Sequence, residues 1–379
     1  MKNYRGITSG NWSPFVGQVT FKHSLFGRKG KIFVSPKGDL LPLGYRGLIA
    51  NNDSLIFGRI PTVRFESLPK DLNEGDCVIM APDGSLTVVW HRDFQTNTLL
   101  LTEKCNCRCL MCPQPPKTHD EWLLSIAREI VNLIDPRDTK TICVTGGEPT
   151  LLGDKFLEIV SLINSRFPDI DFVLLTNGKT FSDYQFAKEY AAVAPPRALT
   201  CVSLHSDIEK NHDEIVGANG SFTRTIQGLY NLARLRIRVE IRHVVSLANA
   251  SRLEGFARFV YRNFPFVYHV ALMGMEMTGL AIENYNKVWI DPADYSCELD
   301  RAAWGLHRAD LNVSIYNIPL CLLPPRSWIF ARQSISEWKH THLPCCDGCC
   351  VKARCAGFFT TSGDWISSRI RPVAAMIEI

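Results

Sequence analysis

From about residue 96 to residue 285, short apolar segments of strand length alternate with longer segments that have the periodicity of amphipathic helices. The expected strands are 98–102, 141–145, 172–176, 199–204, 239–245 and 267–273, and the expected helices are 119–134, 154–166, 182–193 and one capped by Ser221. Repeated units of strand and helix form a parallel sheet with right-handed crossovers. Because such sheets place their active sites at the C-terminal ends of the strands, we expect the functional residues there.

The sequence on either side of this α/β region has a different character. Residues 1–95 contain short strand-like segments broken by Gly, Pro and Asp, and residues 286–379 are irregular and end in a cysteine-rich stretch. The regular segments expected in these flanks are strands at 31–35, 53–57, 77–80, 86–90 and 312–316, a hairpin turn at Pro82-Asp83-Gly84, and a helix near 293–307. We therefore divide the chain into a small β-rich domain, an α/β core over 96–285 and a C-terminal segment.

Cysteine usage and the first residues bear on the compartment. The chain has 379 residues, of which 14 are cysteine, and residues 1–6 contain no apolar segment of the kind found in export signals. No apolar run reaches the roughly 18 residues that a membrane span needs. We therefore expect a cytoplasmic protein, in whose reducing surroundings clustered cysteines bind metal or carry out redox chemistry. The net charge of +4 argues against a nucleic-acid partner.

The first cluster of cysteines directly follows the first core strand. Cys105, Cys109 and Cys112 have the spacing C-x3-C-x2-C, on a loop short enough to wrap three corners of one iron–sulfur cube. With three protein ligands, one iron stays open to S-adenosylmethionine (SAM), and one electron from the cluster then releases a 5′-deoxyadenosyl radical. The alternative is a zinc site with Cys107 as the fourth ligand, although zinc sites usually use C-x2-C pairs. Beside a cluster, Cys107 is expected to be a spare thiol.

A glycine motif lies one strand–helix unit later. Gly146, Gly147, Glu148 and Pro149 end the second strand. The two glycines allow the backbone to approach a ligand closely, and Glu148 can accept a hydrogen bond from an ammonium group. Alone, the motif is an ordinary turn between strand and helix. One unit after the cysteine loop, it indicates a SAM site.

Together these motifs resemble the radical SAM superfamily over about 96–285, and the resemblance implies a partial (β/α)6 barrel with a 4Fe–4S cluster. It implies that Gly146, Gly147 and Glu148 bind the SAM amino group. The further implied contacts with SAM are Asn177 after strand three, Ser203 and His205 at the end of strand four, and Met111, which stands where many members have an aromatic residue near the adenine.

A second group of cysteines lies near the C-terminus. Cys346, Cys349 and Cys355 have the spacing C-x2-C-x5-C, and Cys321 is the nearest other cysteine apart from two adjacent to this group. The spacing resembles the auxiliary-cluster segments of radical SAM enzymes that modify peptides. We therefore expect these four residues to hold one auxiliary iron–sulfur cluster. The alternatives are a shift by one residue to a neighbouring cysteine, an open iron or substrate ligand, and a structural zinc site.

The closest resemblance is to the His-Xaa-Ser system radical SAM maturases (HxsC-like). The segments that carry it are 101–106, 109–112, 114–116, 275–279, 334–339 and 355–359. The resemblance implies hydrogen abstraction from a ribosomally synthesised peptide with His-Xaa-Ser repeats. It also implies a partner radical SAM protein and an electron donor such as flavodoxin or ferredoxin. Because residues 1–95 lack any cluster of ligand or acid–base residues and precede a complete catalytic domain, we expect this domain to serve recognition.

Two other functions remain open at this point. The chain is alternatively a radical SAM enzyme that acts on a small molecule or tRNA, or a non-catalytic zinc-binding protein. Four charged residues near the ends of the last core strands are expected either to face SAM or substrate or to form a solvated rim or buried pair: Glu240, Arg242, His243 and Glu276.

Overall fold

The computed structural model of the chain describes residues 2–8, 11–24, 27–35, 44–52, 60–118, 120–333 and 339–374. The expected strand at 53–57 and most of the 334–339 segment lie outside these residues. The described residues fall into two compact units. One comprises residues 1–101, 121–144 and 158–172, and the other comprises residues 102–120, 145–157 and 173–379.

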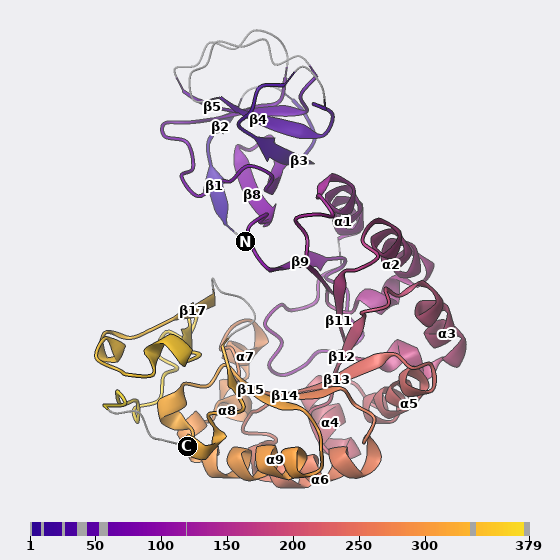
Figure 1. The fold of residues 1–379 in the computed structure, drawn as a ribbon, viewed down its shortest axis with the longest axis vertical. Coiled ribbons are helices and arrows are strands. Elements are labelled where there is room, and N and C mark those ends of the chain that lie inside the picture. The colour runs from indigo at the N-terminus through magenta and orange to yellow at the C-terminus, as the bar shows by residue number, and fades with distance from the viewer. Residues whose placement is uncertain are drawn as a thin grey trace. The chain divides into compact units, whose positions relative to one another are not determined.

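The first unit contains an eight-stranded sheet of order β1-β8-β7-β3-β4-β5-β6-β2 (Figure 1). Its strands are β1 (Asn3–Arg5), β2 (Ile7–Thr8), β3 (Phe15–Thr20), β4 (Lys31–Ser35), β5 (Gly47–Asn51), β6 (Thr62–Phe65), β7 (Cys77–Met80) and β8 (Ser85–Trp90). The expected hairpin is present, because β7 and β8 pair antiparallel around the turn at 82–84. The β-rich character predicted for this part of the chain is confirmed.

This sheet closes on itself at Gly6. The two strands at its ends, β1 and β2, are separated in sequence by this residue alone, so they form one strand that pairs with β8 on one side and β6 on the other. Gly6 N donates to Gly84 O over 2.9 Å, and a Cβ at Gly6 would lie 2.3 Å from Arg64 O. Only glycine fits there. Apolar side chains from around the sheet fill its interior: Val19, Ile32, Ile49, Val63, Val78 and Leu86.

The second sheet has the order β16-β15-β14-β13-β12-β11-β10-β9, and the neighbouring strands from β11 to β16 pair parallel. The strands are β9 (Thr96–Leu100), β10 (Thr141–Thr145), β11 (Asp171–Thr176), β12 (Leu199–Ser203), β13 (Arg238–Val244), β14 (His269–Met273), β15 (Val313–Tyr316) and β16 (Ala331–Arg332). The predicted α/β fold with a parallel sheet is confirmed. The strand expected at 312–316 is present, and it extends this sheet instead of belonging to a separate structure.

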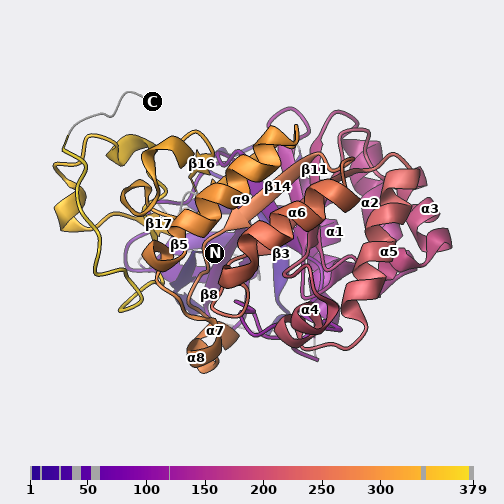
Figure 2. The ribbon, with the colours of Figure 1, turned by 90° about the horizontal axis from the view of Figure 1, so that it is seen from below.

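The helices that accompany this sheet are α1 (Glu121–Leu133), α2 (Asp154–Arg166), α3 (Tyr184–Val193), α4 (Glu209–Val216), α5 (Ser221–Arg234), α6 (Leu253–Asn263), α7 (Leu280–Glu283), α8 (Tyr285–Val288) and α9 (Ser296–Arg308). Figures 1 and 2 show α6 and α9 side by side along the outer face of β13, β14 and β15. The inner face is left to the loops that follow the strands. None of the described helices combines the length and apolar character needed to cross a membrane.

The start of α5 differs from the expectation. Ser221 is the first residue inside the helix, and the capping position belongs to Gly220, at a φ of 66°. The orphan amides at this end are satisfied from α4, because the Asp213 carboxylate accepts from Gly220 N over 2.5 Å and from Phe222 N over 2.8 Å. The prediction that Ser221 caps this helix was wrong, because the Asp213 side chain from α4 accepts the hydrogen bonds that a capping residue would otherwise accept.

Candidate functional site

Backbone hydrogen bonds fix the cysteine loop, which runs between β9 and α1. The amides of Arg108 and Leu110 donate to carbonyls at the C-terminal end of α4 over 2.9 and 2.8 Å. Cys112 O accepts from the first residue of α7 over 2.9 Å. At the base of the loop, the buried Asp120 carboxylate accepts from Thr102 Oγ1. The loop is therefore anchored on several sides although it has no regular structure of its own.

The thiols of this loop converge. Cys105 and Cys109 both donate hydrogen bonds to Cys107, and these bonds, followed by one from Lys179, hold the pKa of Cys107 well below its ordinary value. The same contacts, together with burial, raise the pKa of Cys105 and Cys109. Burial raises the pKa of Cys112, which is also close enough to feel the charge of Cys107. The structure thus brings the three predicted cluster ligands together and places Cys107 among them.

The glycine motif lies directly against the base of the cysteine loop. Gly147 N donates to Thr102 O, and Glu148 N donates to Lys104 O, both over 2.8 Å. A Cβ at Gly146 would lie 2.7 Å from Thr102 O, and one at Gly147 would lie 2.4 Å from Lys104 O. Both distances are shorter than real Cβ contacts. The two glycines are therefore needed for the close approach of two backbone segments, besides any approach to a ligand.

Glu148 is fully buried between the end of β10 and the end of β11. Its Oε1 accepts from Thr150 N over 3.1 Å, from Thr150 Oγ1 over 2.6 Å and from Thr176 Oγ1 over 2.8 Å. Its Oε2 accepts from Asn177 N over 2.6 Å. Burial raises the pKa of this carboxyl, while these hydrogen bonds act in the opposite direction. Glu148 therefore fixes the motif to the next strand, and the adjoining Pro149 is buried as well.

Asn177 and Lys179 connect the end of β11 with the cysteine loop. Asn177 Nδ2 donates to Asn106 Oδ1 over 2.8 Å and to Cys107 Sγ over 3.7 Å. Lys179 is only 2% exposed, and its Nζ donates to Asn106 O over 2.8 Å. Asn177 was expected at this edge from the sequence. Lys179 was not, because a lysine next to a turn is usually solvent-exposed.

Ser203 and His205 lie at and just after the end of β12. Ser203 is partly exposed, and His205 is 5% exposed. Burial, followed by the nearby His212 and His243, lowers the pKa of His205 well below its ordinary value, while Cys107 opposes this shift. His205 N also donates to His212 Nδ1 over 3.2 Å. His205 is therefore a neutral imidazole close to the thiols, and His212 is a neighbour that the sequence did not indicate.

Met111 is 6% exposed and faces the protein. It packs in an apolar cluster with Ile215 of α4, Met277, Ala281 of α7 and Val288 of α8. Its side chain therefore ties the cysteine loop to the segment after β14.

Glu240 lies at the centre of a polar network on the inner face of the sheet. Its Oε1 accepts from Arg242 Nε over 2.6 Å, and its Oε2 pairs with His269 Nδ1 over 2.7 Å. His269 Nε2 in turn lies 2.9 Å from Ser314 Oγ. Burial alone would raise the pKa of Glu240, but the hydrogen bond with His269 and the charge of Arg242 lower it to about 2. Glu240 and Arg242 thus form a buried pair, one of the possibilities left open by the sequence.

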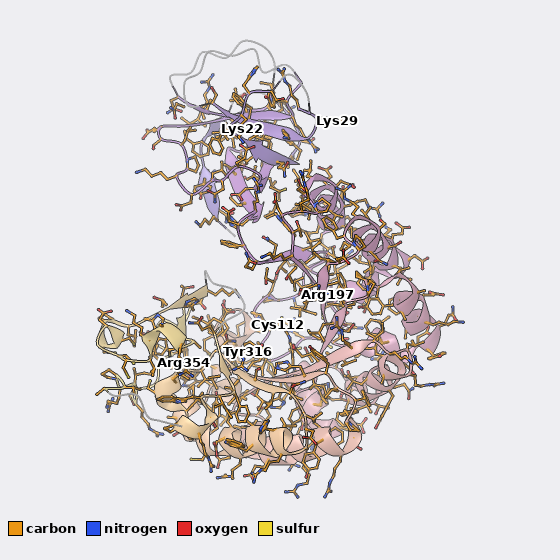
Figure 3. All side chains as sticks on the ribbon, viewed as in Figure 1. Lys22, Lys29, Cys112, Arg197, Tyr316 and Arg354 are labelled. Atoms are coloured by element: carbon orange, nitrogen blue, oxygen red, sulfur yellow. The ribbon has the colours of Figure 1, made fainter. Side chains whose placement is uncertain are left out.

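The two faces of β13 have different neighbours. His243 lies on the helix side, with its ring centroid 4.0 Å from that of Phe256 in α6. Figure 3 shows Tyr316 and Cys112 on the opposite, inner side, away from α6 and α9. Cys112 of the cysteine loop therefore lies on the inner side of the sheet.

Four cysteines of the C-terminal segment line one small cavity of about 20 Å³: Cys321, Cys346, Cys349 and Cys355. Leu320 N and Gly357 N both donate to Cys355 Sγ over 3.4 Å, and Val373 N donates to Cys349 Sγ over 3.3 Å. Amides directed at sulfur favour the thiolate form that metals bind. The structure thus brings together the four cysteines that the spacing had selected, whereas the two adjacent ones are exposed and outside the cavity.

His342 is a further donor at this cavity. It lines the same space, and its Nε2 is buried and has no hydrogen-bond partner among the described residues. Thiolate and imidazole donors suit an iron–sulfur cluster or zinc, so the cysteine-rich segment fits an auxiliary cluster. In the described part of the chain, no three Cys, His, Asp or Glu side chains are already spaced as ligands of a single metal ion. The fit therefore rests on the chemistry of the donors and their convergence.

Residues 99–260 match the family model of the Radical SAM superfamily. The three-cysteine loop after the first strand of the parallel sheet and the glycine motif after its second both lie within this matched region, which has the features of a radical SAM enzyme. Its cofactors are accordingly a 4Fe–4S cluster and SAM. The class, fold and cofactors expected from the sequence are confirmed.

The chain is similar to two curated GTP 3′,8-cyclases over part of its length. The enzyme of Petrotoga mobilis is 28% identical over 197 residues, which cover 49% of this chain and 58% of that protein. The enzyme of Nautilia profundicola is 30% identical over 154 residues, which cover 38% and 45%. The chain thus spans about half the length of these relatives. Among solved structures, Streptococcus suis SuiB bound to S-adenosylmethionine has a TM-score of 0.47 at 16% identity, covering 59% of this chain and 51% of that chain.

Proposed function

We propose that this chain cleaves SAM reductively and uses the product to abstract hydrogen from a peptide. The observation that carries the first part is the convergence of the cysteine loop, the glycine motif and Asn177 at one edge of the sheet. When bound, the cluster and SAM supply a 5′-deoxyadenosyl radical. Cys105, Cys109 and Cys112 would hold the cluster, because they are the three loop thiols with the spacing for its corners.

The residues around the loop would orient SAM. The Glu148 carboxylate is already occupied by protein donors, so we assign the SAM ammonium to the backbone of Gly146 and Gly147, with Glu148 and Pro149 holding that backbone in place. Ser203 and Asn177 lie at the ends of neighbouring strands and would contact the ribose or carboxylate. His205 and Met111 are buried, and they would act by positioning the loop and its surroundings.

The proposal of a peptide substrate is supported by contacts between segments that carry the resemblance to His-Xaa-Ser maturases. Met277, from the 275–279 segment, packs on Met111 of the cysteine loop. Glu276 of the same segment pairs with Lys339 over 2.8 Å and accepts from Thr361 Oγ1 over 3.1 Å. These segments, far apart in sequence, therefore meet beside the cluster loop, with the cysteine-lined cavity in the same part of the chain.

The second candidate function is a reaction on a small molecule, as in the GTP 3′,8-cyclases that the chain resembles. It is favoured by sequence similarity in the α/β region, whereas the peptide proposal is favoured by the C-terminal segments. A partner radical SAM protein and an electron donor such as flavodoxin or ferredoxin belong to the peptide proposal.

The experiment is anaerobic reconstitution with iron and sulfide, followed by measurement of 5′-deoxyadenosine after reduction with SAM present. The wild-type chain should form it, and Cys109→Ala should lose at least about 100-fold, because one of three protein ligands is gone. The matched control is Cys297→Ala, a change at an exposed thiol in α9. Unchanged cleavage by Cys109→Ala would falsify the cluster assignment.

The same preparation separates the two substrates. A peptide with His-Xaa-Ser repeats should change mass in a SAM-dependent manner, whereas GTP should be recovered unchanged. Conversion of GTP, with the peptide untouched, would replace the peptide proposal with the small-molecule one.

A further inference from the structure

The first unit contains a cavity of about 400 Å³ that the proposed function does not use. One side of the cavity comes from the closed β-sheet, with Gln18 of β3, Lys31 of β4 and Trp90 at the end of β8. The other side comes from Leu133 at the end of α1, the turn that follows it, and Arg166, the last residue of α2. All of these residues belong to the same compact unit. Pockets that bind small molecules span roughly 300–1,000 Å³, so this cavity has the size of a ligand site.

The three carboxylates at this cavity already have donors. Glu74 accepts from a threonine hydroxyl over 2.9 Å and from a backbone amide over 2.6 Å. Asp135 accepts from the Arg137 guanidinium over 2.6 Å. Asp138 pairs over 2.6 Å with Arg92, which also lines the cavity, so this pair brings no net charge to it. The occupied carboxylates therefore disfavour a cationic ligand.

Two cations at the cavity, in contrast, have unused donors. Arg166 Nε is buried and has no hydrogen-bond partner among the described residues, while Nη2 of the same guanidinium donates to Asn132 O over 3.3 Å and so holds it in place. Lys31 forms no ion pair with any residue that the structure describes. A buried N–H without an acceptor is costly, and two like charges at one cavity repel each other. An anion in the cavity would relieve both costs.

Apolar side chains form another part of the wall. Trp90 and Ile134 are 3% and 2% exposed, and Leu133 and Pro136 also line the cavity. Apolar walls combined with a few directed polar groups are the usual composition of a small-molecule site. The wall therefore suits a ligand that carries a ring or hydrocarbon group beside its charge.

We propose that this cavity binds an organic anion, which is a carboxylate or phosphate monoester on an apolar or aromatic group. The anionic group accepts charge-assisted hydrogen bonds from Arg166 and Lys31, and the apolar group packs against Trp90 and Ile134. A free metabolite and an acidic residue of a peptide both supply this chemistry. The site shares no residue with the proposed SAM site and requires neither the cluster nor SAM, so its test is independent of the proposed function.

The test is isothermal titration calorimetry of the full-length chain with phenyl phosphate and with benzoate as probes. One of the two should bind once per chain with a dissociation constant below about 1 mM. Arg166→Met and Lys31→Met should each raise that constant about tenfold or more, because a hydrogen bond to the anion is lost. The matched controls are Arg262→Met, in the last turn of α6, and Lys29→Met, at an exposed lysine labelled in Figure 3. Both should bind the probe as the wild type does.

Competition against the bound probe separates the two sources of the anion. Displacement by a glutamate-containing peptide, but not by the same peptide with glutamine, identifies a peptide side chain, whereas displacement by free organic acids alone identifies a metabolite. Benzyl alcohol, which has the ring without the charge, should not compete. Arg166→Lys, which keeps the charge but lacks Nε, replaces the methionine variant if that variant does not fold. No binding of either probe at about 10 mM, or equal dissociation constants in the wild type and the Arg166 and Lys31 variants, would overturn the inference.

Discussion

At the scale of single residues, the second unit depends on buried charges that are paired across neighbouring strands. Glu240 on β13 is 5% exposed. It pairs with Arg242 of the same strand and with His269 of β14. Removing one partner of such a pair is costly because the other is left uncompensated in a poorly solvated place. This network stabilises the inner face of the sheet.

Glu240→Gln should destabilise the folded chain by roughly 3 kcal/mol at pH 7, because folding lowers the pKa of Glu240 from 4.5 to about 2. A lowered folded-state pKa means that the stabilisation is fully present above pH 4.5 and is lost as the pH falls toward 2. The difference in unfolding free energy between wild type and variant should therefore shrink below pH 4.5. A pH-independent difference, measured by denaturant unfolding, would show that the network acts through packing alone.

At the scale of elements, the C-terminal segment is attached to the core through a few defined contacts. Glu276, just after β14, pairs with Lys339, and β15 and β16 extend the core sheet. Cys321 follows β15, whereas the other three cysteines of the cavity come from the last turns of the chain. An auxiliary cluster would therefore join two parts of this segment that are more than twenty residues apart.

Replacing Cys346, Cys349 and Cys355 together with serine should remove about four iron atoms per chain and leave the SAM cluster intact. Cleavage of SAM without peptide should continue, and peptide modification should stop. Replacing the exposed Cys345 and Cys350 in the same way is the matched control, with iron content unchanged. One zinc per chain in the wild type, with the loss of that zinc in the triple variant, would identify the cavity as a zinc site.

At the scale of the whole molecule, the residues proposed for the SAM site all belong to the second unit. The first unit combines the closed β-sheet with α1, and two ion pairs join them or their flanks: Arg46 with Glu129 over 2.7 Å and Arg92 with Asp138 over 2.6 Å. The β-rich part therefore contacts α1 and its flank within the same unit. It contributes none of the thiols of the two candidate metal sites.

A shortened chain beginning at Gln95 should accordingly lose stability, because α1 loses the sheet it packs on, but should still cleave SAM without peptide once folded. It should no longer modify the peptide if residues 1–95 serve recognition. Thermal unfolding, 5′-deoxyadenosine formation and peptide mass give the three measurements. If the shortened chain modified the peptide at the full-length rate, residues 1–95 would not serve peptide recognition.

Much of the core was predictable because it follows from local pattern. The strand at 141–145 and the helix at 154–166 have the predicted bounds, because the spacing of their apolar residues defines both elements. The closure of the first sheet at Gly6 was not predictable, because it depends on which strands meet. The same holds for the membership of β15 in the core sheet and for the cap of α5 by Asp213.

The sequence by itself determined the chemistry of this protein: three thiols at C-x3-C-x2-C spacing after a strand, and a glycine motif one unit later, specify a cluster with an open iron because ligand type and loop length are local properties. Only the tertiary structure decided which distant groups meet there. It placed Asn177 against Cys107, and His342 beside the cavity that Cys321, Cys346, Cys349 and Cys355 line. Burial and pairing depend on chain segments that are remote in sequence, so no local pattern encodes them.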